Sequence, residues 1–223
     1  MCAQKQAPAT AIKIGCVGDS ITAGVHSSGG IHPYPQQLQM LLDMDHGTGN
    51  YSVTNLGACG STMLKKGDSP FWKRPQYGAL VGAKWDIVTI MLGTNDAKDP
   101  GSHGPDNWLH DCGGSSHTSV SNCSFASDYH DMIELVKTLG PQPGVPPKIY
   151  VMIPPPLMAL DSYGMNRTVI NSGVTRGART HAPPRHGSHG GPLAKRGYGP
   201  TRGSLPEARA THQVRKPGGH RHD

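Results

Sequence analysis

Four short apolar runs recur along the first 155 residues, and β-branched or aromatic residues occur in each of them. The runs are residues 12–18, 51–56, 86–92 and 148–153. Each is followed by glycine, proline or small polar residues that are typical of turns. Continuous apolar runs of this length favour strands that are buried on both faces, as in a parallel sheet.

Helical patterns lie between these predicted strands. Pro35 occupies a first-turn position, and apolar side chains follow it at helical spacing at Leu38, Leu41 and Leu42. A second pattern has Ser127 as its expected N-cap and stops at Gly140. Its apolar stripe consists of Tyr129, Met132, Ile133, Val136 and Leu139. Alternating strands and helices predict an α/β layered fold with a parallel sheet.

The charge of the chain divides near residue 172. The whole chain of 223 residues has a formal net charge of +6, of which residues 173–223 contribute +8 and residues 1–172 contribute −2. Residues 173–223 also contain ten Gly, six Pro and six His, with few large apolar side chains and no apolar period. Such a segment cannot bury enough surface to offset its ordering entropy. We therefore predict one globular domain over 1–172 and a basic, disordered tail over 173–223.

Several classes of protein are excluded by what the sequence lacks. No apolar run approaches the ~18 residues of a membrane span. No P-loop, dinucleotide fingerprint or paired CxxC occurs, which argues against sites for NTP, nicotinamide or structural zinc, and no cofactor is predicted. The apolar stretch after Lys5 already belongs to the first strand, so no signal peptide is visible. This favours a cytoplasmic location, with secretion as the alternative if the N-terminus is incomplete.

The five cysteines leave one pairing open. Cys16 lies within a strand pattern, which favours a buried thiol. Cys112 and Cys123 flank a polar Gly/Ser stretch and could form a disulfide within the long loop expected over 97–126. The odd number of cysteines and the absence of a signal peptide argue against that disulfide.

Candidate chemistry follows three of the predicted strands. In open α/β sheets, functional groups gather beyond the carboxyl ends of the strands. Ser20 follows the first strand and offers a hydroxyl nucleophile at a helix entrance. Gly57 follows the second and allows a backbone N–H to approach a substrate oxygen, and Asn95 follows the third with a side-chain N–H donor. Together with the Ser20 amide, these donors would form an oxyanion hole.

At these residues the chain resembles the SGNH (GDSL-type) hydrolase family. Ser20 lies in a Gly-Asp-Ser motif and Asn95 in a Gly-Thr-Asn-Asp motif, and Gly57 matches the glycine of the block between them. The likeness runs from about residue 12 to 171 and is greatest to small esterases that remove acetyl or short acyl groups from sugars. It implies a flavodoxin-like three-layer α/β/α sandwich and metal-free ester hydrolysis. We expect substrate contacts from Asp19, Thr94, Asp96 and Trp108.

The general base that this family supplies is missing from the chain. A serine hydroxyl needs an adjacent base, usually a histidine oriented by a carboxylate. The family provides both in an Asp-x-x-His block after its fifth strand. The acids beyond Asn171 are Glu207 and Asp223, and neither has a histidine three residues later. The resemblance thus implies a sheet without its last strand and helix, and an impaired esterase.

Two explanations fit the abrupt change in composition near residue 172. One is a genuine isoform or diverged protein whose tail has another role. The other, which we favour, is a shifted reading frame or a mis-spliced last exon, because GC-rich DNA read out of frame yields Arg, Gly, Pro, Ala and His. Reading the nucleotide sequence beyond codon 172 in the other frames separates them, since only the second explanation requires an Asp-x-x-His block there.

Two other functions stay open at this point. A domain without its base could be a non-catalytic module that binds acylated glycans through the same site. The basic tail could bind nucleic acid or an acidic membrane surface through its charge. Tyr198 is the tail's one aromatic residue, so base stacking would contribute little. The expected partner of the domain itself is a small-molecule or carbohydrate ester.

Overall fold

Four parallel strands form the central sheet, and the four apolar runs account for all of them. They are β1 (Ile12–Gly18), β2 (Tyr51–Gly57), β3 (Ile87–Met91) and β4 (Lys148–Val151). Each differs from its predicted bounds by at most two residues at an end. The computed structural model describes residues 11–25, 27, 32–98, 107–108, 112, 123–158, 161–162 and 164–174.

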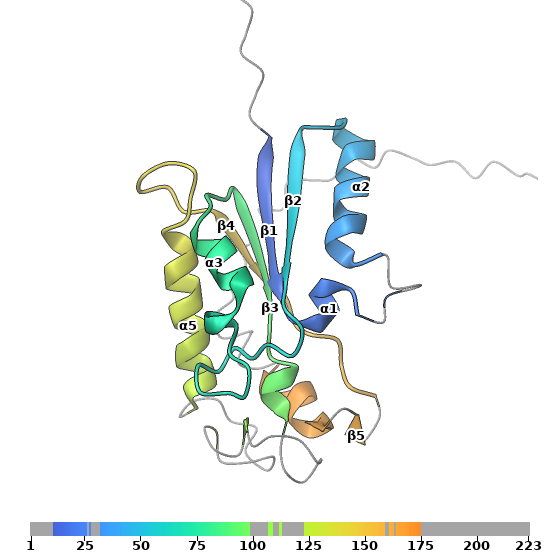
Figure 1. Ribbon diagram of the computed structural model, residues 1–223, viewed down its shortest axis with the longest axis vertical. Helices are drawn as coiled ribbons and strands as arrows, with labels where there is room; N and C mark the ends of the chain where they lie inside the picture. Colours follow the sequence, from blue (N-terminus) through green and yellow to red (C-terminus); the bar gives the residue numbers. More distant parts are fainter. Residues whose placement is uncertain are drawn as a thin grey trace, which may run out of the picture. The chain divides into compact units, whose positions relative to one another are not determined.

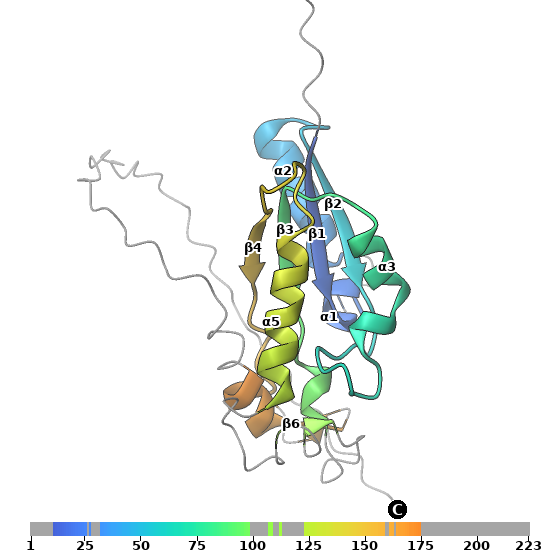
Figure 2. The ribbon, with the colours of Figure 1, turned by 90° about the vertical axis from the view of Figure 1, so that its left-hand side faces the viewer.

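The sheet has the strand order β2-β1-β3-β4, and helices cover both of its faces. α2 (Tyr34–His46) lies on one face, while α3 (Pro75–Val81) and α5 (Ser124–Lys137) lie on the other (Figures 1 and 2). This arrangement confirms the predicted α/β fold with a parallel sheet. The chain passes from β1 to β2 on one side, and the next connection crosses from β2 to β3 on the other side of β1, so the strand order reverses at β1. In open sheets that reversal marks the usual place of a functional site.

The main core lies between the sheet and the pair α3 and α5. Alternate residues of the strands face this side because side chains alternate along a strand. The fully buried strand residues include Val17, Val88 and Ile90. They pack with buried side chains of α3, α5 and the loops, among them Phe71, Leu80, Phe125, Met132 and Val136. Burial of one such side chain contributes about 2 kcal/mol, so this layer fixes the sheet against α5.

The start of α5 differs from the prediction. The helix begins at Ser124, after an N-cap at Cys123, and Ser127 lies inside its first turn with its hydroxyl bonded to the Ser124 carbonyl at 2.9 Å. The apolar stripe explains the difference, because Phe125 is completely buried and extends the stripe one turn earlier. The short helix α3 and the 3-10 turn η2 (Phe71–Lys73) were not predicted.

Short elements gather beyond the carboxyl ends of the strands (Figure 1). They are α1 (Ser20–Ala23), the 3-10 turn η3 (Asn95–Ala97), the strands β5 (Asp161–Ser162) and β6 (Met165–Asn166), and the π-helical turn η5 (Val169–Val174). Val174 packs against Gly93, where φ is +131° and a side chain would be strained.

Two expectations about the loop over 97–126 need correction. Asn107 and Trp108 are buried rather than part of a surface loop, and Phe125 belongs to α5. Cys112 and Cys123 form the disulfide against which their odd number argued. Residues 99–106, 109–111 and 113–122 lie outside the described residues. The free thiol of Cys16 is buried as predicted, and this burial raises its pKa.

The predicted tail over 173–223 lies outside the described residues from 175 onward, so its boundary and its disorder stay predictions. All described residues belong to one compact unit, Met1–Arg185. Within them, no helix is long and apolar enough to cross a membrane.

β4 forms one edge of the sheet in the described part of the chain. It pairs with β3 on one side, and no described strand pairs with it on the other. Tyr150 is 54% exposed and Ile153, two residues beyond the strand, is 41% exposed. An edge strand with exposed apolar side chains offers unpaired backbone groups to another chain.

We expect the chain to self-associate through β4, and Tyr150→Lys and Ile153→Lys to reduce that association. A charged side chain at an edge disfavours strand pairing between molecules. Val81→Lys on α3 is the matched control, because Val81 is 38% exposed and α3 packs against β2, the strand at the opposite end of the sheet order from β4. Light scattering across a concentration series measures the effect. Equal association of all three variants and the parent chain would refute the role of β4.

Candidate active site

Ser20 is the first residue of α1, directly beyond the carboxyl end of β1. The preceding Asp19 is the N-cap, and its Oδ1 accepts a hydrogen bond from the Ile21 amide at 2.9 Å. This short-range bond turns the chain from strand to helix at Ser20. Ser20 is half-buried, and its hydroxyl has no hydrogen-bond partner among the described residues. The turn thus presents a serine hydroxyl that is not engaged elsewhere.

Gly57 ends β2 and lies beside Gly18 in the parallel register. A Cβ at Gly57 would lie 2.7 Å from both the Ala23 Cα and the Thr22 carbonyl carbon. Real Cβ contacts are never so close, so glycine is required here by the approach of α1 and not by a positive φ. The close approach brings the end of β2 next to the turn that carries Ser20.

Asn55 connects the end of β2 to α1. Its Oδ1 accepts a hydrogen bond from the Gly57 amide at 2.9 Å, and its Nδ2 donates to the Thr22 carbonyl at 2.9 Å. The Gly57 amide, one of the predicted oxyanion donors, is therefore already bonded in this structure. A substrate oxygen at this position would have to share that amide with Asn55.

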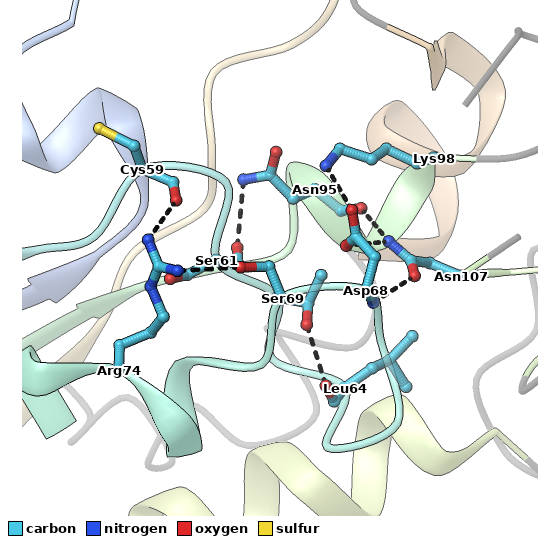
Figure 3. Close-up of polar contacts among 10 residues, drawn as sticks. Cys59, Ser61, Leu64, Asp68, Ser69, Arg74, Asn95, Lys98 and Asn107 are labelled. Carbon is cyan, nitrogen blue, oxygen red and sulfur yellow. Dashed lines mark hydrogen bonds and ion pairs between the residues drawn. The ribbon is translucent and has the colours of Figure 1, made fainter. Parts of the chain in front are cut away.

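Asn95 and Asp96 follow β3 and bind the loop that follows β2. Asn95 is 3% exposed, and its Nδ2 donates to the Ser61 carbonyl at 3.1 Å (Figure 3). One of the two amide hydrogens of Asn95 is left by this bond for another acceptor. Asp96 is completely buried and accepts the amides of Met63 at 2.9 Å and Leu64 at 2.7 Å. Both side chains therefore fix the loop over 61–64 against β3.

Burial shapes the protonation of the two buried carboxyl groups. Burial raises the pKa of Asp96 to about 7, against the opposing effect of the Leu64 and Met63 amides, and the Asp19 charge adds to the rise. Burial likewise raises the pKa of Asp19, while the hydrogen bond from the Ile21 amide lowers it. Neither carboxyl group is oriented as a partner for a histidine by any hydrogen bond of the described residues.

The four residues predicted to contact substrate are all buried. Trp108 is completely buried beside Phe125, with ring centroids 5.6 Å apart, and Gly173 packs against it. Trp108 is thus part of the core, and this burial disfavours the expected substrate contact, which stays a prediction. Asp19 and Asp96 are 1% and 0% exposed and hold backbone amides, which also disfavours direct substrate contact. The proposed roles of Ser20, Gly57, Asn95 and Thr94 stay predictions.

Four buried polar atoms at the strand ends have no hydrogen-bond partner among the described residues. They are Asp19 Oδ2, Thr22 Oγ1, Ser61 Oγ and Thr94 Oγ1. All four belong to turns that directly follow β1, β2 or β3. Unpaired buried polar atoms are uncommon and gather at functional sites.

The described residues include three histidines, and none is placed as a base for Ser20. His32, His46 and His130 are exposed, and none bonds to the serine. His46 lies beside Tyr51 at the start of β2, so it is at the opposite end of that strand from Gly57. Among the described residues, no group of three His, Cys, Asp or Glu side chains could hold a metal ion.

Two residues that the sequence did not single out connect segments of the site by hydrogen bonds. They are Asn55 and Asn107, whose side chains connect segments far apart in the chain. Asn55 could have been noticed from its place at a strand end. Asn107 lies in a polar stretch without periodicity, and its partners are 12 and 39 residues away, so no local signal identifies it.

We expect the free energy of unfolding of the parent chain to fall as the pH rises from about 4 to about 7. We expect Asp96→Asn to remove this fall. Folded Asp96 keeps its proton to about pH 7, whereas its ordinary pKa is 3.8. Its contribution is therefore fully present below about pH 4 and is lost as the pH rises through 7, by up to about 4 kcal/mol. Urea denaturation at several pH values measures this, with the exposed Asp45→Asn as control. A slope unchanged by Asp96→Asn would contradict the assignment.

Comparisons with known proteins agree with this arrangement. The model of the GDSL-like lipase/acylhydrolase family matches residues 16–184. An acetylxylan esterase of Xylanibacter ruminicola is 34% identical over 144 residues, which are 62% of this chain and 24% of that protein. The chain thus spans about a quarter of the length of this relative.

Two solved structures share the fold. The native aryl esterase of M. smegmatis has a TM-score of 0.52 at 20% identity, over 76% of this chain and 80% of that one. The lipase/acylhydrolase of Enterococcus faecalis has a TM-score of 0.50 at 22% identity, over 76% of this chain and 70% of that one. At such identities the likeness concerns the fold alone. The family model covers more than half of the sequence and includes all three strand-end motifs, so the chain belongs to the GDSL-like lipase/acylhydrolase family.

Proposed function

We propose that the chain is a serine ester hydrolase that removes an acetyl or short acyl group, with a carbohydrate as the alcohol. Ser20 is the nucleophile, and the Ser20 amide, the Gly57 amide and Asn95 Nδ2 bind the oxyanion. The observation that carries this proposal is that the carboxyl ends of β1, β2 and β3 lie side by side. Ser20 follows the first of them at the start of α1, and its hydroxyl has no hydrogen-bond partner among the described residues. Family membership supports the reaction class.

The reaction proceeds in two steps that each move one proton. Ser20 Oγ attacks the acyl carbon and loses its proton, and the alcohol leaves with a proton when the carbonyl re-forms. Water then attacks the acyl-serine, which releases the carboxylic acid and restores the serine hydroxyl. Each tetrahedral intermediate carries a negative oxygen, which the N–H donors at the ends of β1, β2 and β3 stabilise. Loss of one such donor typically costs about 3 kcal/mol of barrier.

The first proton transfer limits the activity of this chain. The sequence contains no Asp-x-x-His block after Asn171, and none of the described histidines bonds to Ser20. Without a positioned base the proton of Ser20 passes to water, and a positioned base is worth roughly 10²–10⁴ in rate. The proposed activity is therefore weak.

The acetyl ester and the carbohydrate are proposed from one relative. The acetylxylan esterase shares 34% of its residues with this chain over the matched part, but the chain spans only 24% of it. The similarity supports an acetyl group as the acyl part of the substrate. The sugar is proposed on the same basis, and acetylated xylo-oligosaccharides are the first substrates to test.

We expect Ser20→Ala to abolish a slow hydrolysis of p-nitrophenyl acetate, and added imidazole to raise the Ser20-dependent rate at least several-fold. Imidazole supplies a base in place of the missing Asp-x-x-His block, since none of the described histidines bonds to Ser20. Ser27→Ala is the matched control, because it removes a serine hydroxyl near α1 whose one hydrogen bond among the described residues goes to the Gly24 carbonyl, at 2.8 Å. Rates that are equal in the parent chain and Ser20→Ala, with and without imidazole, would refute the nucleophile.

A second function is favoured by the same missing base. A site with donors but no base can bind an acylated glycan without cleaving it. Titration of acetylated xylo-oligosaccharide by calorimetry, with acetate release followed in the same sample, separates the two functions. Binding without release, unchanged by Ser20→Ala, would support the binding module over the esterase.

A further inference from the structure

The side chain of Asn107 connects three segments that are distant in sequence. Asn107 is 2% exposed. Its Oδ1 accepts the Asp68 amide at 2.8 Å, and its Nδ2 donates to Asp68 Oδ1 and to the Asn95 carbonyl, each at 2.9 Å (Figure 3). One acceptor and two donor hydrogens are thus in use, which satisfies the amide. A buried amide with every group paired is held in a single orientation.

An ion pair between Asp68 and Lys98 extends this connection toward the protein surface. Asp68 Oδ2 accepts Lys98 Nζ at 2.9 Å, and the two side chains are 27% and 14% exposed. The Asn107 backbone amide also donates to the Lys98 carbonyl at 3.2 Å. The four residues Asp68, Asn95, Lys98 and Asn107, which we call the Asn107 clamp, therefore join the loop after β2 to the turn after β3.

The backbone hydrogen bonds of η3, the turn that contains Asn95, are weak. The backbone hydrogen bonds within and after η3 are long, with Ala97 N to Thr94 O at 3.4 Å and Lys98 N to Asn95 O at 3.3 Å. The bond from Asn107 to the same Asn95 carbonyl is shorter, at 2.9 Å. Bonds longer than about 3.2 Å are weak. The orientation of the peptide group after Asn95 therefore depends more on Asn107 than on the turn itself.

The two bonds on Asn95 come from opposite ends of the residue. Asn107 holds its backbone carbonyl, and the Ser61 carbonyl accepts its side-chain Nδ2 at 3.1 Å. Because both the backbone carbonyl and the side-chain amide of Asn95 are held, the second hydrogen on Nδ2 points in one fixed direction. Arg74 holds the same loop from another side, through the Cys59 carbonyl at 3.0 Å and Ser69 Oγ at 3.3 Å (Figure 3).

We propose that Asn107 is a positioning residue for the oxyanion donor Asn95. This inference rests on the proposed function, because it assigns Asn107 to the same site. Asn107 does not touch the substrate. It sets the Asn95 peptide, and the Asn107 clamp sets the loop that receives the Asn95 side chain. A shift of about 1 Å in a catalytic group can cost about a hundredfold in rate.

Asn107→Leu tests the proposal, because leucine keeps the branching of the side chain and removes all three of its hydrogen bonds. We expect kcat for the Ser20-dependent, imidazole-assisted hydrolysis to fall between about tenfold and a hundredfold, with KM changed less than about twofold. Asn50→Leu is the matched control, since Asn50 also binds two carbonyls, those of His46 and Gly47, but at the end of α2.

A second measurement does not need activity. The side-chain amide signals of Asn95 in a ¹H–¹⁵N NMR spectrum, assigned by their loss in Asn95→Asp, should shift in Asn107→Leu and stay in place in Asn50→Leu. If Asn107→Leu does not fold, Asn107→Ala replaces it, because the shorter side chain removes the same three hydrogen bonds and places no new group against Asp68.

The outcomes separate the two proposals. If the parent chain shows no Ser20-dependent turnover, the proposed esterase fails, and the Asn95 signals still test the positioning. A folded Asn107 variant with unchanged Asn95 signals would overturn the role of Asn107, whatever the activity. Shifted signals with an equal fall in kcat/KM and kcat support it.

Discussion

The first turn of α1 lies directly against the end of β2, and the position of Ser20 depends on this contact. Neither Gly18 nor Gly57 has space for a Cβ: at Gly57 it would lie 2.7 Å from the Thr22 carbonyl carbon, and at Gly18 2.6 Å from the Thr22 Cβ. The two glycines are neighbours in the register of β1 and β2. Any side chain there would push α1 outward, and the serine at its first residue would move with it.

The rest of the site consists of side chains that pair backbone groups beyond the carboxyl ends of the strands. Beyond the last ladder bond, backbone amides and carbonyls lose their partners, and each must be paired in another way when it is buried. Here amide and carboxylate side chains take over: Asn55 at β2, Asn95 and Asp96 after β3, and Asn107 across both. The side chains that pair these groups are the same ones that orient the candidate oxyanion donors. Fold stability and site geometry are therefore coupled at this edge.

The sequence was sufficient for the strands and for the three motifs, because both are local patterns. A buried parallel strand is a continuous apolar run, and Ser20, Gly57 and Asn95 each follow such a run directly. Local patterns could not reveal Asn107 or the burial of Trp108, because their partners come from distant segments. The start of α5 was missed for a related reason, since packing of Phe125 against Tyr129 and Trp108 decides it.

The two halves of a serine hydrolase site have different structural requirements, and the described residues contain the proposed elements of one half. The nucleophile and its oxyanion donors need only three strand ends and the turns between them, all of which lie before residue 98. A base must come from a later element that reaches the same edge, and the described sheet ends with β4. Serine hydrolases that lose a triad member still accelerate the reaction roughly 10³–10⁴-fold over water, through the oxyanion hole and substrate binding. Under the proposed function, the donors at the strand ends therefore retain catalytic value without the base, because they stabilise the charged intermediate however slowly it forms.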